Sequence, residues 1–314
     1  MRYFLPILFL LIFVSNSFSQ KADTARIGCY IISLHDLDFV EEQFTARFWL
    51  WLVHKNPIEK PSDAIEIPLA KEFKIDNIIA DSLDDKGWLS LKIKAVMKQK
   101  WELHNFPFDK QKLRIVVENP QLTLENFVFV PDTTGKAYDP ELTVDGWRIT
   151  NFKIYTSKGH YNTAFGDYHI KNAETDYSQF VIDIDIERDA WGLFLKLFLG
   201  MYVAFAISYV SFFIDAGHAE PRFGLPVGGL FAAVGNKYVI DSYLPETSTL
   251  TIVDTLHGLT FIMIFVIIAF SALSLRQDDS GQEKLSNNTD RVVGITIGLI
   301  YLIFNVVSIL NALF

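Results

Sequence analysis

The segment RFGLPVGGLFAAVGNKYVIDSYLP, residues 222–245, decides how the rest of the chain is interpreted. It is apolar enough to lie at membrane depth, yet it is rich in glycine. A set of residues recurs at alternating steps of four and three, which places them on one side of an α-helix: Gly224, Gly228, Phe231, Gly235, Tyr238 and Ser242. Small side chains with one central aromatic ring suit a helix face turned toward a shared axis, whereas a lipid-facing side favours large apolar residues. We therefore expect this helix to line a pore.

A second interpretation of the same segment stays open. Gly224 and Gly228 form a GxxxG pair, which also brings two helices into close contact. Asn236 and Lys237 are deeper than a lipid-exposed helix allows, because a charge near the membrane centre costs about 2.5–3.5 kcal/mol. The segment therefore predicts either a pore helix or a tightly packed internal helix.

The composition excludes several functions. Half of the 314 residues are hydrophobic and the net charge is −9, so the chain offers no basic face to nucleic acid. Cys29 is the one cysteine; we expect a buried core residue, with no disulfide and no Cys/His metal site. The sequence lacks a nucleophile elbow, a metal motif and a phosphate loop, so we expect no enzyme, no metal and no cofactor.

Residues 1–20 have the pattern of a secretory signal peptide. Arg2 supplies the positive end, and an apolar run from Phe4 to Val14 is followed by small and polar residues. That run is shorter than the roughly 20 residues of a membrane-spanning helix. We expect cleavage near Ser19 or Gln20, which leaves the mature N-terminus on the far side of the membrane.

Residues 21–190 show the period of two that is typical of β-strands. Two long strand-like runs, Ile27 to Leu34 and Phe44 to Val53, are joined by a polar turn and predict a hairpin. Further strand-like stretches lie at residues 66–69, 73–79, 88–96, 112–117, 127–130, 147–155 and 180–186. Many short strands with regularly spaced turns predict an immunoglobulin-like β-sandwich.

Residues 191–314 are expected to form a four-helix transmembrane domain. Four spans have sufficient length and hydropathy: 191–214, 222–243, 250–275 and 291–314. The polar loop expected at 277–290 is flanked by Arg276 and Arg291, whereas the loop at 241–246 is acidic. Basic residues favour the cytoplasmic side, so the β domain is expected outside the cell membrane, in agreement with the signal peptide.

The motif between Trp101 and Leu113 resembles the signature loop of pentameric ligand-gated ion channels, the Cys-loop receptor superfamily. The resemblance is carried by an acidic residue, a leucine and an aromatic-Pro-aromatic-Asp sequence: Glu102, Leu103, Phe106, Pro107, Phe108 and Asp109, followed by Gln111. The cysteines that close this loop in animal members would fall at Gln99 and Leu113. Their absence resembles the bacterial branch of the family, which implies a multi-pass protein of the bacterial inner membrane with a periplasmic N-terminal domain.

The resemblance extends over most of the chain in the family's order. Arg188 matches a basic residue that precedes the first helix, Leu244-Pro245 matches the end of the pore helix, and Leu250 to Asp254 resembles the start of the third helix. The family implies a homopentamer in a lipid bilayer, with one copy of the second helix from each subunit around an axis through which inorganic ions pass.

The sequence departs from the family in the agonist pocket and in the pore. The interval from Leu52 to Phe106 is shorter than the family's, and its Trp-x-Pro-Asp segment is not recognisable. The inner pore carries Gly224 and Gly228 where the family usually has hydroxyl side chains, and Gly200 stands where it often has proline. These departures favour a rival hypothesis, a non-conducting periplasmic sensor or binding protein that retains the channel architecture.

For the pore, we expect Phe231 to form a narrow aromatic ring that gates by dewetting; it could also point into a neighbouring helix. Glu220 at the cytoplasmic mouth and Asp241 near the extracellular mouth would form carboxylate rings that favour cations. Arg222 lies close to Glu220, and Pro221 resembles anion-selective members, so anion selectivity is the alternative.

For coupling between the domains, we expect Arg188 to need a carboxylate at the membrane boundary. The resemblance makes Asp109 the first candidate, with Glu41 or Glu42 on the hairpin turn as competitors. The hairpin turn, the loop of Phe106, Pro107 and Phe108, and the loop of Pro245 should meet at one interface. The alternative is that Arg188 only anchors the chain at the membrane surface.

For ligand recognition, aromatic residues lie on the late strands and on residues 157–178, which resemble the family's capping loop over the agonist: Trp147, Tyr155, Tyr161, Tyr168 and Tyr177. Aromatic rings there could enclose a cationic small molecule, or they could be ordinary core and turn residues. Protons are a second candidate agonist, sensed by His104, His160 or His169. A divalent ion held by Asp36, Asp38, Glu41 and Glu42 is a further alternative to a solvated turn.

Overall fold

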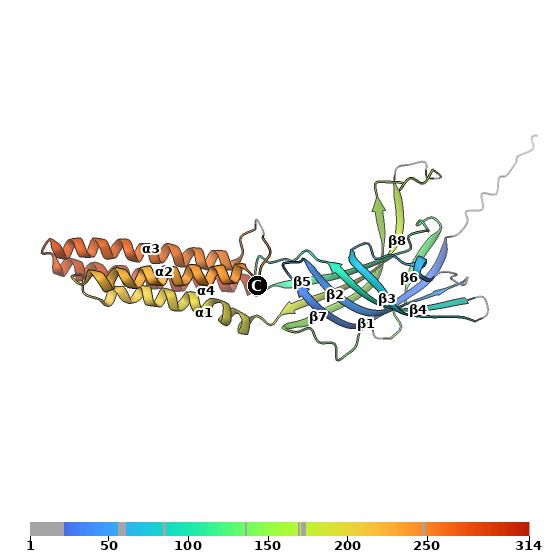
Figure 1. Ribbon diagram of the computed structural model, residues 1–314, viewed down its shortest axis with the longest axis horizontal. Helices are drawn as coiled ribbons and strands as arrows, with labels where there is room; N and C mark the ends of the chain where they lie inside the picture. Colours follow the sequence, from blue (N-terminus) through green and yellow to red (C-terminus); the bar gives the residue numbers. More distant parts are fainter. Residues whose placement is uncertain are drawn as a thin grey trace, which may run out of the picture.

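The computed structural model of the protein describes residues 22–55, 61–83, 86–135, 137–168, 170, 174–246 and 249–313. A β-rich N-terminal domain is followed by four long helices, and the two parts lie end to end along the longest axis (Figure 1). The expected signal peptide, residues 1–20, lies outside the described residues. The C-terminus returns to the boundary between the two parts (Figure 1).

The larger sheet is built on the expected hairpin. Strands β1 (Asp23–Asp38) and β2 (Gln43–His54) pair antiparallel. Strands β3 (Ala70–Leu83) and β4 (Lys86–Lys98) extend the sheet beyond β2, and β6 (Phe127–Pro131) adds to β1 in parallel. The strand order is β3-β4-β2-β1-β6.

The smaller sheet has the order β5-β8-β7, with β5 (Lys110–Glu118), β8 (Thr175–Arg188) and β7 (Trp147–Tyr161). Ile182, Ile184 and Ile186 of β8 are buried, as their alternation with polar residues predicts. They belong to the same buried cluster as Phe48 and Leu50 of β2. The two sheets therefore share one hydrophobic core.

The stretch 66–69, expected as a strand, forms only an isolated bridge between Glu66 and Glu118, followed by a turn. Pro68 has no backbone N–H and cannot continue a ladder of hydrogen bonds. A short 3₁₀ helix, Pro61–Ala64, precedes it. The strand prediction failed here because the apolar residues were counted without the proline.

The helices α1 (Ala190–Tyr209), α2 (Ala219–Asp241), α3 (Ile252–Asp279) and α4 (Glu283–Leu313) are each long and apolar enough to cross a membrane. A 3₁₀ turn, Val210–Phe213, extends α1. The protein therefore has the composition of a multi-pass membrane protein.

The polar segment 277–290 is mostly helical rather than a loop. α3 continues to Asp279 and α4 starts at Glu283, so residues 280–282 make the connection, with Gly281 at φ +75°. An apolar run marks only the part of a helix that membrane thickness requires, and polar turns can extend it at either end. The expected fourth span, 291–314, is therefore preceded by two further helical turns.

Helices α1 and α2 pack closely at Gly229. A Cβ atom there would meet the hydroxyl of Ser208 at 2.1 Å and the carbonyl of Ala204 at 2.6 Å, both on α1. A Cβ at the neighbouring Gly228 would have no heavy atom within 4 Å. Two adjacent glycines therefore have opposite surroundings: one is required for packing, and the other is not.

We predict that Gly229→Ala destabilises the helical domain by about 1–3 kcal/mol, because the added methyl group forces α1 and α2 apart. Gly228→Ala is the matched control, and its better helix propensity stabilises the domain by up to about 1 kcal/mol. Thermal unfolding of the two variants in the same detergent measures the difference. Equal melting temperatures would show that Gly229 is not a packing constraint.

Candidate functional site

The glycine-rich stripe of α2 is not used in packing within the chain. Phe231 and Tyr238 are 73% and 78% exposed, and a Cβ atom at Gly224, Gly228 or Gly235 would have no neighbour within 4 Å. The opposite face packs against the other helices through Arg222, Pro226, Gly229, Ala233 and Ile240, which are buried. Within one chain, Gly224 and Gly228 thus make no GxxxG contact among the described residues.

Arg222 lies at the start of α2 but points into the helix bundle. Its guanidinium group is fully buried, forms an ion pair with Asp290 of α4, and donates a hydrogen bond to the carbonyl of Ile214 at 2.9 Å. Ser274 of α3 donates to the same carboxylate at 2.9 Å. The charge of Arg222 is therefore neutralised away from the exposed stripe, which removes the expected argument for anion selectivity. Glu220, in the first turn of α2, is exposed.

The other end of α2 carries a second group of charges. The ammonium group of Lys237 lies 2.7 Å from a carboxylate oxygen of Asp241 and 2.7 Å from one of Asp254 on α3. Asp241 is therefore a compensated charge, not a free carboxylate. The amide of Asn236 donates to the carbonyl of Leu197 at 3.1 Å and lies 3.0 Å from His257. The polar residues that are unusual at this depth thus all have partners.

A buried ion pair joins the two domains. Arg188, at the end of β8, donates to both carboxylate oxygens of Asp109 at 2.6 and 3.1 Å, and the two side chains are 9% and 0% exposed. The guanidinium group lies 4.0 Å from the ring centroid of Trp147, with the rings of Phe39 and Phe106 at 4.9 and 5.1 Å. Arg188 is thus enclosed by one carboxylate and three aromatic rings.

Glu41 does not compete for Arg188. It is exposed on the hairpin turn, where its backbone N–H donates to Asp38 at 2.8 Å. Glu42 instead lines a cavity of about 370 Å³ together with Pro245 and His104. The hairpin turn, the β4–β5 loop and the α2–α3 loop therefore meet in one place.

Two further contacts fasten the β4–β5 loop to the helices. The backbone N–H of Ile252, the first residue of α3, donates to the carbonyl of His104 at 3.0 Å. The ring of Phe108 packs against Trp191 and Phe194 of α1, with centroids 5.3 and 5.4 Å apart. Pro107 and Phe106 are buried beside them.

Two of the predicted ligand residues come together near the turn between β7 and β8. Tyr161 and Tyr177 lie 5.7 Å apart, and Phe165 lies 5.5 and 6.3 Å from them. The hydroxyl of Tyr161 donates to Glu118 at 2.8 Å. Burial and then the Glu118 carboxylate raise the pKa of Tyr161 and of Tyr177. The result is an aromatic cluster with a carboxylate at its base.

The other three predicted ligand residues lie elsewhere. Trp147 is at the opposite end of β7, against Arg188. Tyr155 donates to Asp183 at 3.1 Å, and Tyr168 is 87% exposed. The five aromatic residues therefore do not form one box, because a 15-residue strand separates Trp147 from Tyr161.

The alternative agonist sites receive less support. A hydrogen bond from Asp176 raises the pKa of the exposed His160, His104 contacts the Leu250 carbonyl, and His169 lies outside the described residues. Within the part of the chain that the structure describes, no three His, Cys, Asp or Glu side chains are arranged to hold a metal ion. The acidic hairpin turn with Asp36 and Asp38 is therefore a solvated turn.

Several residues of these sites were missed in the sequence. Asp290 and Asp254 were read as parts of a loop and of a helix start, and Glu118 and Phe165 were not singled out. Their signal is a partner distant in the sequence, which local patterns do not contain. No protein-family model matches the sequence.

We predict that Asp109→Asn lowers the free energy of unfolding by about 3–5 kcal/mol, because it leaves Arg188 as a buried and uncompensated charge. Lys112→Gln is the control, since its ion pair with Asp185 spans 3.7 Å and is partly exposed, and such pairs contribute at most about 1 kcal/mol. Thermal or denaturant unfolding of the full chain compares them. A loss no greater for Asp109→Asn than for Lys112→Gln would contradict the role of the ion pair.

Proposed function

We propose that the chain is one subunit of a homopentameric ligand-gated ion channel of the bacterial inner membrane. The β domain, an immunoglobulin-like sandwich, lies on the periplasmic side, and four helices span the bilayer. The observation that carries the proposal is the exposed stripe of α2, which one subunit leaves without a packing partner.

The composition of that stripe supports a water-filled axis. Exposed residues of α4 are large and aliphatic, as a lipid-facing surface requires: Leu299, Leu302, Ile303, Val306 and Leu310. The exposed stripe of α2 instead carries three glycines, a serine, a tyrosine and a phenylalanine. Bare glycine backbone gains little from contact with lipid chains, but it leaves room where five helices converge.

The conduction path follows from this arrangement. Phe231 lies at the middle of α2, where five copies would make a hydrophobic constriction that excludes water when narrow. Glu220 supplies a ring of carboxylates at the cytoplasmic mouth and makes the pore cation-selective, since Arg222 is neutralised by Asp290. Asp241 contributes less to selectivity because Lys237 compensates its charge.

Agonist binding is assigned to the aromatic cluster of Tyr161, Phe165 and Tyr177. Three rings with Glu118 at their base suit a small organic cation, which gains from both the ring faces and the carboxylate. β8 runs directly from Tyr177 to Arg188, so a movement of the cluster is transmitted along one strand to the domain boundary.

A non-conducting sensor is the second candidate. The observation in its favour is the glycine content of the inner half of α2, where Gly224 and Gly228 offer no side chain to an ion. The same fold and the same aromatic cluster would then report ligand binding without an ion current.

Phe231→Ala tests conduction directly. We predict that this variant, reconstituted in planar bilayers, shows a resting current that the parent protein lacks, because a wider and less apolar constriction stays wetted. Phe265→Ala is the matched control, since Phe265 is equally exposed on α3, at 68%, away from the α2 stripe. Silence of every variant, with and without a panel of small amines and pH steps, would favour the sensor.

Glu220→Lys tests selectivity. In a gradient of a monovalent salt, we predict that the reversal potential moves from the cation toward the anion equilibrium potential, because a ring of positive charge replaces a ring of carboxylates. Glu283→Lys makes the same charge reversal in the first turn of α4 and should leave the reversal potential unchanged. An equal reversal potential in the Glu220 variant and its parent would remove Glu220 from the filter.

A further inference from the structure

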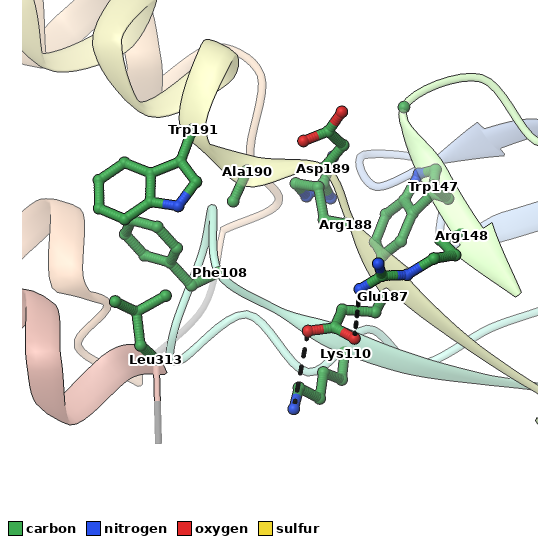
Figure 2. Close-up of a pocket in the computed structure, with 11 residues that line it drawn as sticks. Phe108, Lys110, Trp147, Arg148, Glu187, Arg188, Asp189, Ala190, Trp191 and Leu313 are labelled. Atoms are coloured by element: carbon green, nitrogen blue, oxygen red, sulfur yellow. Dashed lines mark hydrogen bonds and ion pairs between the residues drawn. The ribbon is translucent and has the colours of Figure 1, made fainter. Parts of the chain in front are cut away.

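A cavity of about 440 Å³ opens at the boundary between the β domain and the helices. It lies where β5 and β7 begin, where β8 passes into α1, and where α4 ends (Figure 2). Lys110, Arg148 and Glu187 line it on the side of the β domain, and Phe108, Trp191 and Leu313 line it on the side of the helices. The cavity therefore has one polar wall and one apolar wall.

The polar wall holds exposed charges of both signs. Glu187 lies between Lys110 at 3.8 Å and Arg148 at 3.2 Å (Figure 2). The side chains of these two cations are 68% and 76% exposed. Arg188 also lines the cavity, but its charge is taken by Asp109. Lys110 and Arg148 are thus the cations that remain accessible to a ligand.

Asp189 supplies the second negative charge. It is exposed at the residue before α1, and its carboxylate makes no capping hydrogen bond to the helix. In Figure 2 the carboxylates of Asp189 and Glu187 point to opposite sides of the cavity. The accessible charges of the wall, Lys110 and Arg148 against Glu187 and Asp189, sum to zero.

The apolar wall continues down α1. The indole of Trp191 is 54% exposed and packs against Phe108. Leu195 and Leu199, each 60% exposed, follow at intervals of four residues and so lie below Trp191 on the same face of the helix. A molecule with its polar end in the cavity could lay its apolar part along this face.

The position of the cavity identifies the kind of molecule. α1 begins and α4 ends at the level of the cavity, so in a bilayer spanned by these helices it lies at the depth of the lipid headgroups, where tryptophan is enriched. The headgroup of a zwitterionic phospholipid carries a phosphate and an ammonium group a few bonds apart, which matches a neutral wall with separated charges.

We propose that this cavity is a binding site for a phospholipid with a primary ammonium headgroup. Its phosphate lies between Lys110 and Arg148, its ammonium group lies against Asp189, and its acyl chains follow Trp191 and Leu195. Charge-assisted hydrogen bonds to the phosphate supply the affinity. Asp189 supplies the preference over an anionic lipid. The site requires that the helices span a membrane, but it does not require that the protein conducts ions.

The experiment measures thermal unfolding of the delipidated full-length protein in detergent with added short-chain lipids. We expect phosphatidylethanolamine to raise the melting temperature at lower concentration than phosphatidylcholine or phosphatidylglycerol. Free phosphoethanolamine and inorganic phosphate, which lack acyl chains, should have no effect at the same concentrations. The double variant Lys110→Gln, Arg148→Gln should need about tenfold more phosphatidylethanolamine for the same shift.

Two further variants separate recognition from folding. Asp189→Asn should keep the response to lipid but lose the preference for phosphatidylethanolamine over phosphatidylglycerol. Lys112→Gln, Lys153→Gln, which removes two exposed cations of the same strands farther from the helices, should behave like the parent. The proposal is overturned if free phosphate acts like the lipid, if phosphatidylglycerol is preferred by the parent, or if the control pair loses as much as the Lys110, Arg148 pair.

Discussion

The ion pair between Arg188 and Asp109 is the contact on which the joining of the two domains depends. It lies between the last strand of the β domain and the loop that touches α1 and α3, and it is enclosed by aromatic rings. A pair with this little exposure is costly to break, because either partner alone would be a charge without solvent or counterion. The buried core continues past it without interruption, since Phe194, Phe198 and Met201 of α1 belong to the same cluster as the sheets. The two domains are therefore packed together and not merely linked by a flexible chain.

The helical domain solves a related problem with its own charges. Arg222 and Asp290 fix the start of α2 to α4, and Lys237 with Asp241 and Asp254 fixes its other end to α3. Both sets lie off the exposed stripe, so the face with Gly224 and Phe231 stays free of internal ion pairs. The same helix is thus fully committed on one side and bare on the other, which is the arrangement that a subunit of a symmetric assembly needs.

The architecture followed from local patterns because alternation of side chains and apolar runs of membrane length are written along the chain. Seven of the eight strand-like regions and all four helices lie where these patterns place them, with the ends shifted. What the patterns lacked was long-range partnership. Asp290 in an apparent polar loop gave no sign that it would meet Arg222, 68 residues away. The five aromatic residues assigned to one ligand site were grouped by type, and the length of β7 separates them. Arg188 was matched with Asp109 only through the resemblance of the signature loop to a known family, since nothing in their spacing relates them.

The attachment of Arg222 to Asp290 has a mechanical consequence. A rod clamped at its base and pushed at its tip moves least where it is clamped, so any tilt of α2 must grow with distance from the cytoplasmic end. The clamp lies opposite the bundle end that touches the β domain (Figure 1). The upper turns of α2 therefore sweep through the largest arc, and the lower turns act as the fulcrum. A five-fold arrangement of such levers would open like an iris hinged at its inner rim.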